Sequence, residues 1–246
     1  MYKYYADLHI HSCLSPCGDD DNTPCNIVNM ACLKNLTLIA VTDHNTVRNA
    51  VSAVKAAEIN ESPIIVVPGV EITTSEEIHT LLYFPDCDTA LRFEEETLLP
   101  ARMMIKNKPE FFGRQLIFNE ADEQTGEDEH LLISATAISI DDMPAVAKRY
   151  GAAFVPAHID KDANSLIAIL GDFPRYLEFS AIEVKDKSKV QNIRDIYNLG
   201  DKRIFTSSDA HYLWDILEAG EGEMNAIEIE TTDEIKSAAD FVRHLI

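Results

Sequence analysis

The stretch YADLHIHS, residues 5–12, decides the fold of this chain, because an apolar start is followed by two histidines one residue apart. In a β-strand successive side chains point to opposite faces, so His9 and His11 would project from the same face. Two imidazoles placed in this way can bind one metal ion. A single His-x-His pair also fits a polar strand end with two solvated histidines, so the rest of the chain must decide between these interpretations.

Five later apolar runs have the composition of strands, and each is bordered by a histidine or a carboxylate; they are residues 38–42, 64–70, 80–84, 152–157 and 203–208. Between several of them, apolar residues recur at helical spacing, as in 47–54 and 190–197. Strands that alternate with helices predict a largely parallel α/β sheet or barrel. The length of 246 residues predicts one domain over 1–246.

Residues 87–133 interrupt this rhythm. Two short apolar runs, 115–118 and 131–133, flank an acidic loop over 120–130, and this pattern predicts a hairpin inserted into the barrel. The acids of this loop lack the spacing of an EF-hand, so a solvated loop is favoured over a calcium site.

The formal net charge is −21, from 42 acidic and 21 basic residues. Such a charge opposes long-range attraction to DNA, RNA or an anionic membrane, so no long nucleic acid and no membrane are expected as partners. The first residues lack the apolar segment and cleavage site of a secretory signal, which favours the cytoplasm and reduced thiols. The five cysteines include no C-x-x-C pair, which argues against a zinc knuckle.

The chain has eight histidines, and six of them border predicted strands: His9, His11, His44, His79, His158 and His211. Because the C-terminal strand ends of a barrel meet on one face, these six should converge. Asp209 and His211 repeat the one-residue spacing of His9 and His11, and Glu71 adds another carboxylate. The sequence therefore predicts a metal site with mixed nitrogen and oxygen ligands, which suits manganese, iron or zinc.

Five motifs resemble those of the polymerase and histidinol phosphatase (PHP) superfamily, in that family's order: D-L-H-I-H-S at 7–12, V-T-D-H-N at 41–45, G-V-E-I at 69–72 with His79 after it, P-A-H at 156–158 and S-S-D-A-H at 207–211. The resemblance implies a distorted (β/α)7 barrel with two or three divalent metals at one face. It also implies hydrolysis of phosphoesters, in which bridged metal ions activate a water and bind the phosphate oxygens.

The resemblance further implies a set of ligands for each metal. The first metal would take His9, His11, Glu71 and Asp209, and the second would share Glu71 with His79 and His158. The third would take His44, His211 and one ligand from the first loop. Many family members have a histidine in that loop, and this chain has none between His11 and His44. In relatives similar to nucleotide phosphatases an aspartate lies four residues before a Thr-Pro pair, so the candidate is Asp19, with Asp20 behind it.

Asp43 and His211 are the candidate catalytic residues, and Asp43 is expected to orient the neighbouring ligand His44 rather than to act as a general acid. Four cations near strand ends are candidates for binding the substrate phosphate, although each also fits a solvated surface: Lys161, Lys185, Lys187 and Arg194.

The predicted function is hydrolysis of a small phosphorylated substrate, with nucleotide-like phosphomonoesters foremost. Three alternatives stay open: a nuclease that trims single-stranded ends, a histidinol phosphatase, and a non-catalytic PHP module that serves a partner. A nuclease should have basic or aromatic tracks for the nucleic-acid backbone, and these are not obvious in this acidic sequence. The missing loop histidine argues against a histidinol phosphatase, and the retained ligands argue against a non-catalytic module.

Overall fold

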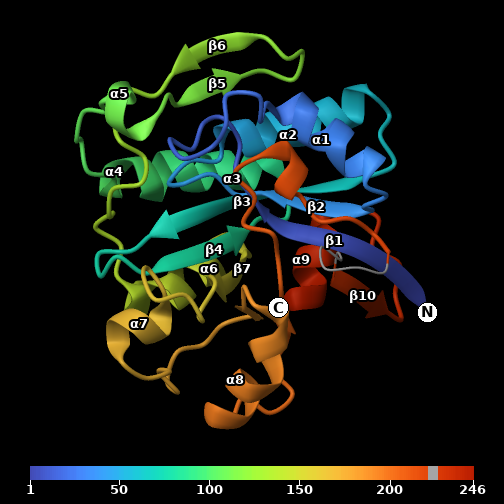
Figure 1. Cartoon of the computed structure of the whole chain (residues 1–246), viewed down its shortest axis with the longest axis vertical. Helices are drawn as coiled ribbons and strands as arrows, with labels where there is room; N and C mark the ends of the chain where they lie inside the picture. The colour runs from blue at the N-terminus through green and yellow to red at the C-terminus, as the bar shows by residue number, and fades with distance from the viewer. Residues whose placement is uncertain (221–226) are drawn as a thin grey trace.

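The computed structural model describes residues 1–220 and 227–246, and its centre is a curled six-stranded sheet with the order β10-β1-β2-β3-β4-β7 (Figure 1). A separate pair of short parallel strands, β8 and β9, lies between β7 and β10 in the chain. The strands of both sheets are β1 (Tyr2–Ile10), β2 (Leu38–Val41), β3 (Ile65–Thr73), β4 (His79–Tyr83), β7 (Ala153–Pro156), β8 (Ile182–Glu183), β9 (Ile204–Phe205) and β10 (Ile227–Thr231).

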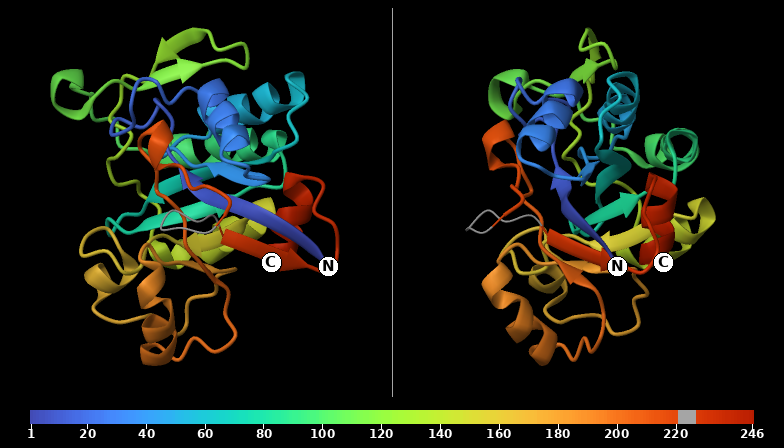
Figure 2. Two further views of the ribbon diagram at one scale, coloured as in Figure 1. Left: turned by 45° about the vertical axis from the view of Figure 1, so that its right-hand side comes forward. Right: turned by 90° about the vertical axis from the view of Figure 1, so that its right-hand side faces the viewer.

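Helices surround the curled sheet, and Figure 2 shows α7 and α8 at one end of the molecule and a hairpin of two further strands at the other. The helices are α1 (Pro24–Leu33), α2 (Arg48–Ile59), α3 (Cys87–Phe93), α4 (Leu99–Ala101), α5 (Pro109–Phe112), α6 (Met143–Tyr150), α7 (Leu166–Leu170), α8 (Val190–Ile196) and α9 (Ala238–Leu245). Short 3-10 or π turns are η1 (Glu94–Leu98), η2 (Ile140–Asp142), η3 (Lys187–Lys189) and η4 (Leu213–Asp215).

The first half of the sheet is built from parallel strands joined by helices. β1, β2 and β3 are parallel, with α1 and α2 as the two crossovers. Thr23 caps α1 by accepting a hydrogen bond from Asn26 N, and Pro24 occupies the first turn, where its missing N–H costs nothing. These local signals agree with the alternation that the sequence predicts.

The second half of the sheet is antiparallel, which corrects the prediction of a largely parallel sheet. β4 is antiparallel to β3 and to β7, and β10 is antiparallel to β1. Only residues 74–78 separate β3 from β4, and so short a connection allows a hairpin but no crossover helix. The predicted fold class is confirmed nonetheless, because a curled α/β sheet of this kind is the distorted barrel expected of a PHP fold.

The predicted hairpin is present, but its second strand lies elsewhere. β5 (Leu116–Phe118) pairs with β6 (Gln124–Glu127), inside the stretch predicted as an acidic loop, rather than with 131–133. The side chain of Asn119 accepts hydrogen bonds from Ala121 N and Glu123 N and so forms the turn. β6 has no apolar alternation, so its strand conformation depends on pairing with β5. That 87–133 is an insertion stays a prediction.

The core occupies both faces of the sheet. Leu38 and Ala40 of β2 pack with Phe241 of α9 in one buried cluster. Ile39 packs in another cluster with Ile27 of α1 and further residues of α2. Full burial of each large apolar side chain contributes roughly 1.5–3 kcal/mol, so this core can support a site that contains buried charge. Among the described residues, no helix is both long enough and apolar enough to cross a bilayer.

Candidate metal centre

Glu71 lies at the centre of a cluster of histidines that come from distant parts of the chain. Its Oε1 atom is 2.9 Å from His79 Nδ1 and 3.1 Å from His158 Nε2. Its Oε2 atom is 3.0 Å from His44 Nδ1 and 3.4 Å from His11 Nε2. The residue is 1% exposed, so this carboxylate is surrounded by imidazoles rather than by water.

Backbone pairing between strand ends brings these residues together. His11 N donates to Ala210 O at 2.9 Å, and Ala210 N donates to His9 O at 3.3 Å. The two pairs of ligands with one-residue spacing, 9/11 and 209/211, therefore lie side by side. A further parallel bridge joins His44 to Glu71. The predicted convergence of strand ends thus has a direct cause in the sheet.

Asp209 completes the centre from the opposite side of β1. Its Oδ1 atom is 3.3 Å from His11 Nε2 and 3.5 Å from His9 Nε2, and its other oxygen accepts a hydrogen bond from Lys161. Asp209 has a φ of +49° and His158 a φ of +27°, conformations that favour glycine. Such backbone strain of about 1–3 kcal/mol is typical of functional sites.

The histidine tautomers in the centre fit divalent cations. Glu183 accepts the Nδ1 proton of His9 at 3.0 Å. The hydroxyl of Ser15 donates its proton to Asp43 Oδ1 at 2.7 Å, so Ser15 accepts the Nδ1 proton of His11 at 2.9 Å. When both rings are neutral, they present Nε2 lone pairs 3.1 Å apart, and a bound cation removes the repulsion between them. Without a metal, a proton on His9 satisfies the same contact.

Two buried atoms of the centre support the same interpretation. Glu71 Oε2 and His44 Nδ1 have no hydrogen-bond partner among the described residues, although they are 3.0 Å apart. An unpaired buried polar atom costs about 1–3 kcal/mol, which coordination of a metal would remove. Imidazole and carboxylate donors together suit zinc, manganese or iron.

The electrostatics of the centre are strongly coupled. Burial alone would raise the pKa of Glu71, but the neighbouring histidines 79, 9 and 44 hold that pKa well below its usual range. Burial alone would lower the pKa of His9, but the negative charges of Glu183, Glu71 and Asp209 raise it well above its usual value. The surrounding carboxylates therefore keep a proton on His9 when the centre holds no metal.

The structure brings together eight of the nine predicted ligands. Three sets of side chains place one ligand atom each within 4.8 Å of one another: His9 with His11 and Glu71, His44 with Glu71 and His79, and His11 with Cys17, His44 and His211. His158 and Asp209 contact the same cluster. The predicted division of these ligands among three metals stays a prediction.

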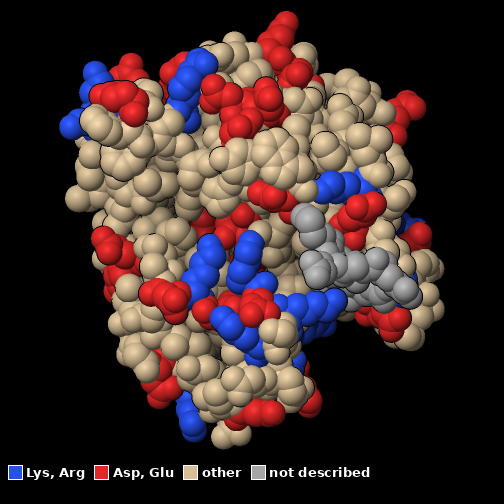
Figure 3. All heavy atoms as spheres, in the orientation of Figure 1, with Lys and Arg blue, Asp and Glu red and all other residues tan. Residues whose placement is uncertain are grey.

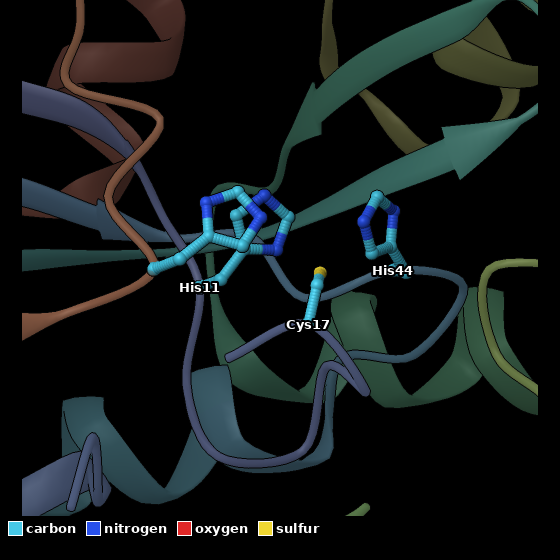
Figure 4. Close-up of side chains that lie close together, drawn as sticks. His11, Cys17 and His44 are labelled. Atoms are coloured by element: carbon cyan, nitrogen blue, oxygen red, sulfur yellow. The ribbon is translucent and has the colours of Figure 1, made fainter. Parts of the chain in front are cut away.

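Asp19, the ninth predicted ligand, belongs to none of these three sets. Its Oδ1 atom accepts a hydrogen bond from Asp21 N at 3.0 Å, as in a turn closed by an aspartate side chain. Asp20 lies 3.6 Å from Arg114, outside the centre. Cys17 occupies the place expected for the loop ligand, beside His11 and His44 (Figure 4). That Asp19 supplies the loop ligand stays a prediction.

Asp43 is buried and has a different partner from the predicted one. Its carboxylate accepts hydrogen bonds from Ser12 N at 2.8 Å, from Ser12 Oγ at 2.6 Å and from Ser15 Oγ at 2.7 Å. It therefore orients His11 through Ser15 instead of orienting His44. With both oxygens engaged, it is not exposed as a general acid. His211 is more accessible, with 28% of its side chain exposed, and its Nδ1 is 2.9 Å from Asp209 O.

Glu183, at the end of β8, is a further residue of the centre and is not among the residues predicted from the sequence. It is 1% exposed, contacts His9 Nδ1 and also accepts a hydrogen bond from His158 N at 2.9 Å. Burial raises the pKa of Glu183, but the charge and hydrogen bond of His9 lower it overall. No histidine or second acid flanks it in the sequence, so no local signal identifies it.

Two of the four predicted phosphate-binding cations lie at the edge of the centre. Lys161 donates to Asp209, and Lys185 donates to Ser208 O. A cavity of about 360 Å³ is lined by Lys161 together with His79, His158, Asp162, Ala163 and Asn164. Lys187 is exposed in η3. Arg194 is not brought to the centre, because its guanidinium donates to the carbonyls of Gly200 and Lys202.

No protein-family model matches the sequence. An uncharacterized protein of Methanocaldococcus jannaschii is 38% identical over 99 residues, which are 37% of this chain and 57% of that protein. A solved structure of a candidate metal-dependent phosphoesterase from Bifidobacterium adolescentis is similar with a TM-score of 0.58 and 17% identity, over 98% of this chain and 94% of the other.

Endonuclease Q also has a similar structure. The lesion-specific enzyme from Pyrococcus furiosus matches with a TM-score of 0.56 and 16% identity, over 86% of this chain and 49% of that chain. Its complex with a 27-mer duplex, which has an abasic lesion at the active site, matches with a TM-score of 0.59. This chain therefore spans about half the length of Endonuclease Q.

These similarities correct the prediction that long nucleic acid is not a partner. That prediction is wrong because Endonuclease Q, which shares this fold, binds duplex DNA at its active site. The net charge of the whole chain is a poor guide to nucleic-acid binding. Charges farther than a Debye length of about 8–10 Å from the binding surface are screened by salt, so the charges near that surface matter most. Figure 3 shows Lys and Arg side chains gathered on one part of this face, over the region of β8 and α8.

Identity to these two solved structures is 16–17%, so the similarity to them is one of fold. The sheet, the strand-end motifs and the cluster around Glu71 agree with them. The architecture that the five motifs imply agrees with these comparisons, because this chain shares its fold with the phosphoesterase from Bifidobacterium adolescentis and with Endonuclease Q.

Proposed function

We propose that this chain is a metal-dependent hydrolase of phosphoesters and that the cluster around Glu71 is its active centre. The observation that carries the proposal is one buried carboxylate in contact with His11, His44, His79 and His158, next to a cavity that reaches solvent. Divalent ions held by such ligands activate a water and polarise phosphate oxygens. No nucleophilic side chain is then required for the reaction.

The chain's own residues hold and orient the centre. Glu71 uses both oxygens and is the natural bridging carboxylate between two positions. Glu183 keeps the proton of His9 on Nδ1, and the Asp43–Ser15 pair does the same for His11, so both Nε2 atoms face inward. Buried partners of this kind fix ligand geometry and typically control metal affinity about 10–100-fold.

For the substrate, we propose that the phosphate enters the cavity beside His79 and His158. Lys161 lines this cavity and, together with Lys185, can neutralise phosphate oxygens, at the expense of their present contacts with Asp209 and Ser208. Small nucleotide-like phosphomonoesters remain the first proposal. The ring of His79 is partly exposed there, which leaves room for the ester.

A second candidate substrate is the phosphodiester backbone of a nucleic acid. The Lys and Arg side chains over β8 and α8 favour it, because cations on that part of the surface can contact backbone phosphates, although Asp and Glu side chains lie among them. The duplex-bound Endonuclease Q, with its similar fold, also favours it. Histidinol phosphate is a third substrate to test, and no observation in the structure favours it.

The test is a parallel assay of the manganese-loaded and zinc-loaded protein. The substrates are a nucleoside bisphosphate, histidinol phosphate, a labelled single-stranded oligonucleotide and a duplex with an abasic site. Release of phosphate or cleavage that disappears in Glu71→Gln, and persists in His244→Ala, would support the proposal. Absence of hydrolysis of all four substrates by metal-loaded protein would overturn it. Preferential cleavage of either oligonucleotide would assign the second candidate.

A further inference from the structure

We propose that Cys17 supplies a thiolate ligand to a metal ion that it holds together with His11, His44 and His211, and that this sulfur makes the position selective for zinc or another thiophilic divalent metal. The inference deepens the proposed function, because it concerns one position of the same metal centre. It differs from the sequence-based prediction, in which a carboxylate of the first loop completes this position.

The geometry of these four side chains is that of a potential tetrahedral site. The sulfur of Cys17 and one ring nitrogen from each histidine all lie within 4.8 Å of one another. Figure 4 shows the sulfur pointing toward the space between the imidazoles of His11 and His44. In a tetrahedral zinc site, bonds of about 2.0–2.3 Å place neighbouring ligand atoms about 3.3–3.6 Å apart. The four side chains therefore need to contract by about 1 Å.

The rings of the set are already packed together. The ring centroid of His11 is 4.4 Å from that of His211 and 4.6 Å from that of His44. His44 is 5% exposed, and its Nδ1 has no hydrogen-bond partner among the described residues. That nitrogen lies 3.0 Å from Glu71 Oε2, so the ring of His44 belongs both to this set and to the set around Glu71.

The backbone of the first loop holds Cys17 in this place. Gly18 N donates to Ser15 O at 2.8 Å, and Asp19 N donates to His211 O at 2.9 Å. A Cβ atom at Gly18 would lie 2.2 Å from Ser12 O, so only glycine allows this close approach next to Cys17. The loop is thus tied to His211 and to the end of β1 on either side of the thiol.

The sulfur of Cys17 distinguishes this metal position from the positions around Glu71. The sets around Glu71 contain only imidazole and carboxylate donors, which accept manganese, iron or zinc. A thiolate strongly favours zinc over manganese or magnesium. We therefore infer two kinds of position in one centre, of which the one at the solvent-facing loop is selective for thiophilic metals.

The experiment is a titration of metal-free protein with cobalt(II), which replaces zinc and gives a sulfur-to-cobalt charge-transfer band in the near ultraviolet. The wild type should show this band, and Cys17→Ser should lose it while still binding cobalt at the other positions. Cys25→Ser is the matched control, because Cys25 follows the same loop but contacts Glu120 O. Its band should match that of the wild type.

Competition with a zinc chelator gives a second, independent readout. We expect Cys17→Ser to weaken zinc binding at one position by at least about tenfold, while manganese binding changes little. Cys17→His should restore zinc binding without the sulfur band and should improve manganese binding. Far-ultraviolet circular dichroism verifies that each variant is folded.

The outcomes separate this inference from the proposed function. If the wild type binds neither cobalt nor zinc, the proposed metal centre itself is wrong. If cobalt binds without a sulfur band, or if the band persists in Cys17→Ser, the centre stands and the thiolate ligand is refuted. Equal loss of zinc and manganese in Cys17→Ser would also refute it, because a general loss of packing has no preference for thiophilic metals.

Discussion

The Nε2 atoms of His9 and His11 face each other at 3.1 Å, at the end of one strand and inside one buried cluster. Each ring is turned by a different partner on its Nδ1, namely Glu183 for His9 and Ser15 for His11. Because each partner contacts the Nδ1 side of its ring, the two Nε2 atoms point into the same space. This arrangement suits the two nitrogens to binding one cation between them.

Replacement of Glu71 should be the most damaging single change to the centre. Glu71→Gln keeps the shape but removes a charge that contacts several imidazoles. Since loss of a partner that only orients a ligand costs about 10–100-fold in metal affinity, loss of this carboxylate should cost more than 100-fold. Elemental analysis measures the metal content. His130→Ala and His244→Ala are the controls and should retain it, and normal metal content in Glu71→Gln would contradict the assignment.

The structure predicts two to three divalent metals per chain, and their removal should destabilise the fold. A metal present at about 100 times its dissociation constant adds about 2.7 kcal/mol of stability, equivalent to about 5–10 °C in Tm for a chain of this size. Thermal unfolding with and without chelator measures the shift. Glu71→Gln should show little shift. Elemental analysis that finds one ion or none in the wild type would contradict the predicted number.

Glu183 should act as a positioning residue for His9. In Glu183→Gln the amide can donate as well as accept, so the tautomer of His9 is no longer enforced. We expect metal affinity to fall about 10–100-fold, with the folded state retained. Isothermal titration with manganese measures the affinity. Glu178→Gln, at an exposed position five residues earlier in the chain, is the control. Unchanged affinity in Glu183→Gln would assign the residue to structure alone.

Metal affinity should rise with pH through the neutral range and above. The pKa of His9 is well above its ordinary value because of Glu183, Glu71 and Asp209, so metal-free protein keeps a proton on this ring near neutrality. That proton stabilises the metal-free fold at low pH, and the stabilisation is lost as pH rises through the raised pKa. Metal must displace the proton, so binding should tighten with pH. Calorimetry in buffers of different ionisation enthalpy should detect proton release, and binding that is independent of pH would contradict this.

Exposed lysines should distinguish the two candidate substrates. Lys187 and Lys189 are exposed in η3, where Lys189 Nζ lies 3.8 Å from Asp160, whereas Lys161 and Lys185 donate to Asp209 and to Ser208 O. If a nucleic acid is the substrate, Lys187→Ala with Lys189→Ala should weaken oligonucleotide binding and reduce its salt dependence by about one unit of slope per lysine. Hydrolysis of a nucleoside bisphosphate should be unchanged. Lys236→Ala, at an exposed site beside α9, is the control. Equal effects on both substrates would argue against a separate nucleic-acid surface.

Much of the centre could be predicted from the sequence, because its ligands come in short patterns tied to strand ends. The one-residue spacing of His9 and His11, and of Asp209 and His211, identifies both pairs, because alternate residues of an extended segment share a face. Glu71, His79 and His158 follow or begin apolar runs, and the α/β class follows from the same runs. These features depend on local conformation, which a sequence specifies directly.

Other features were decided by the tertiary structure alone. Glu183 and Cys17 have no pattern around them, and they reach His9 and His11 through pairing and loop closure between distant segments. The antiparallel half of the sheet and the polar strand β6 likewise depend on which neighbour each segment pairs with. The reason is physical: spacing along the chain determines which side chains share a face, whereas contacts between elements depend on how all the elements pack at once.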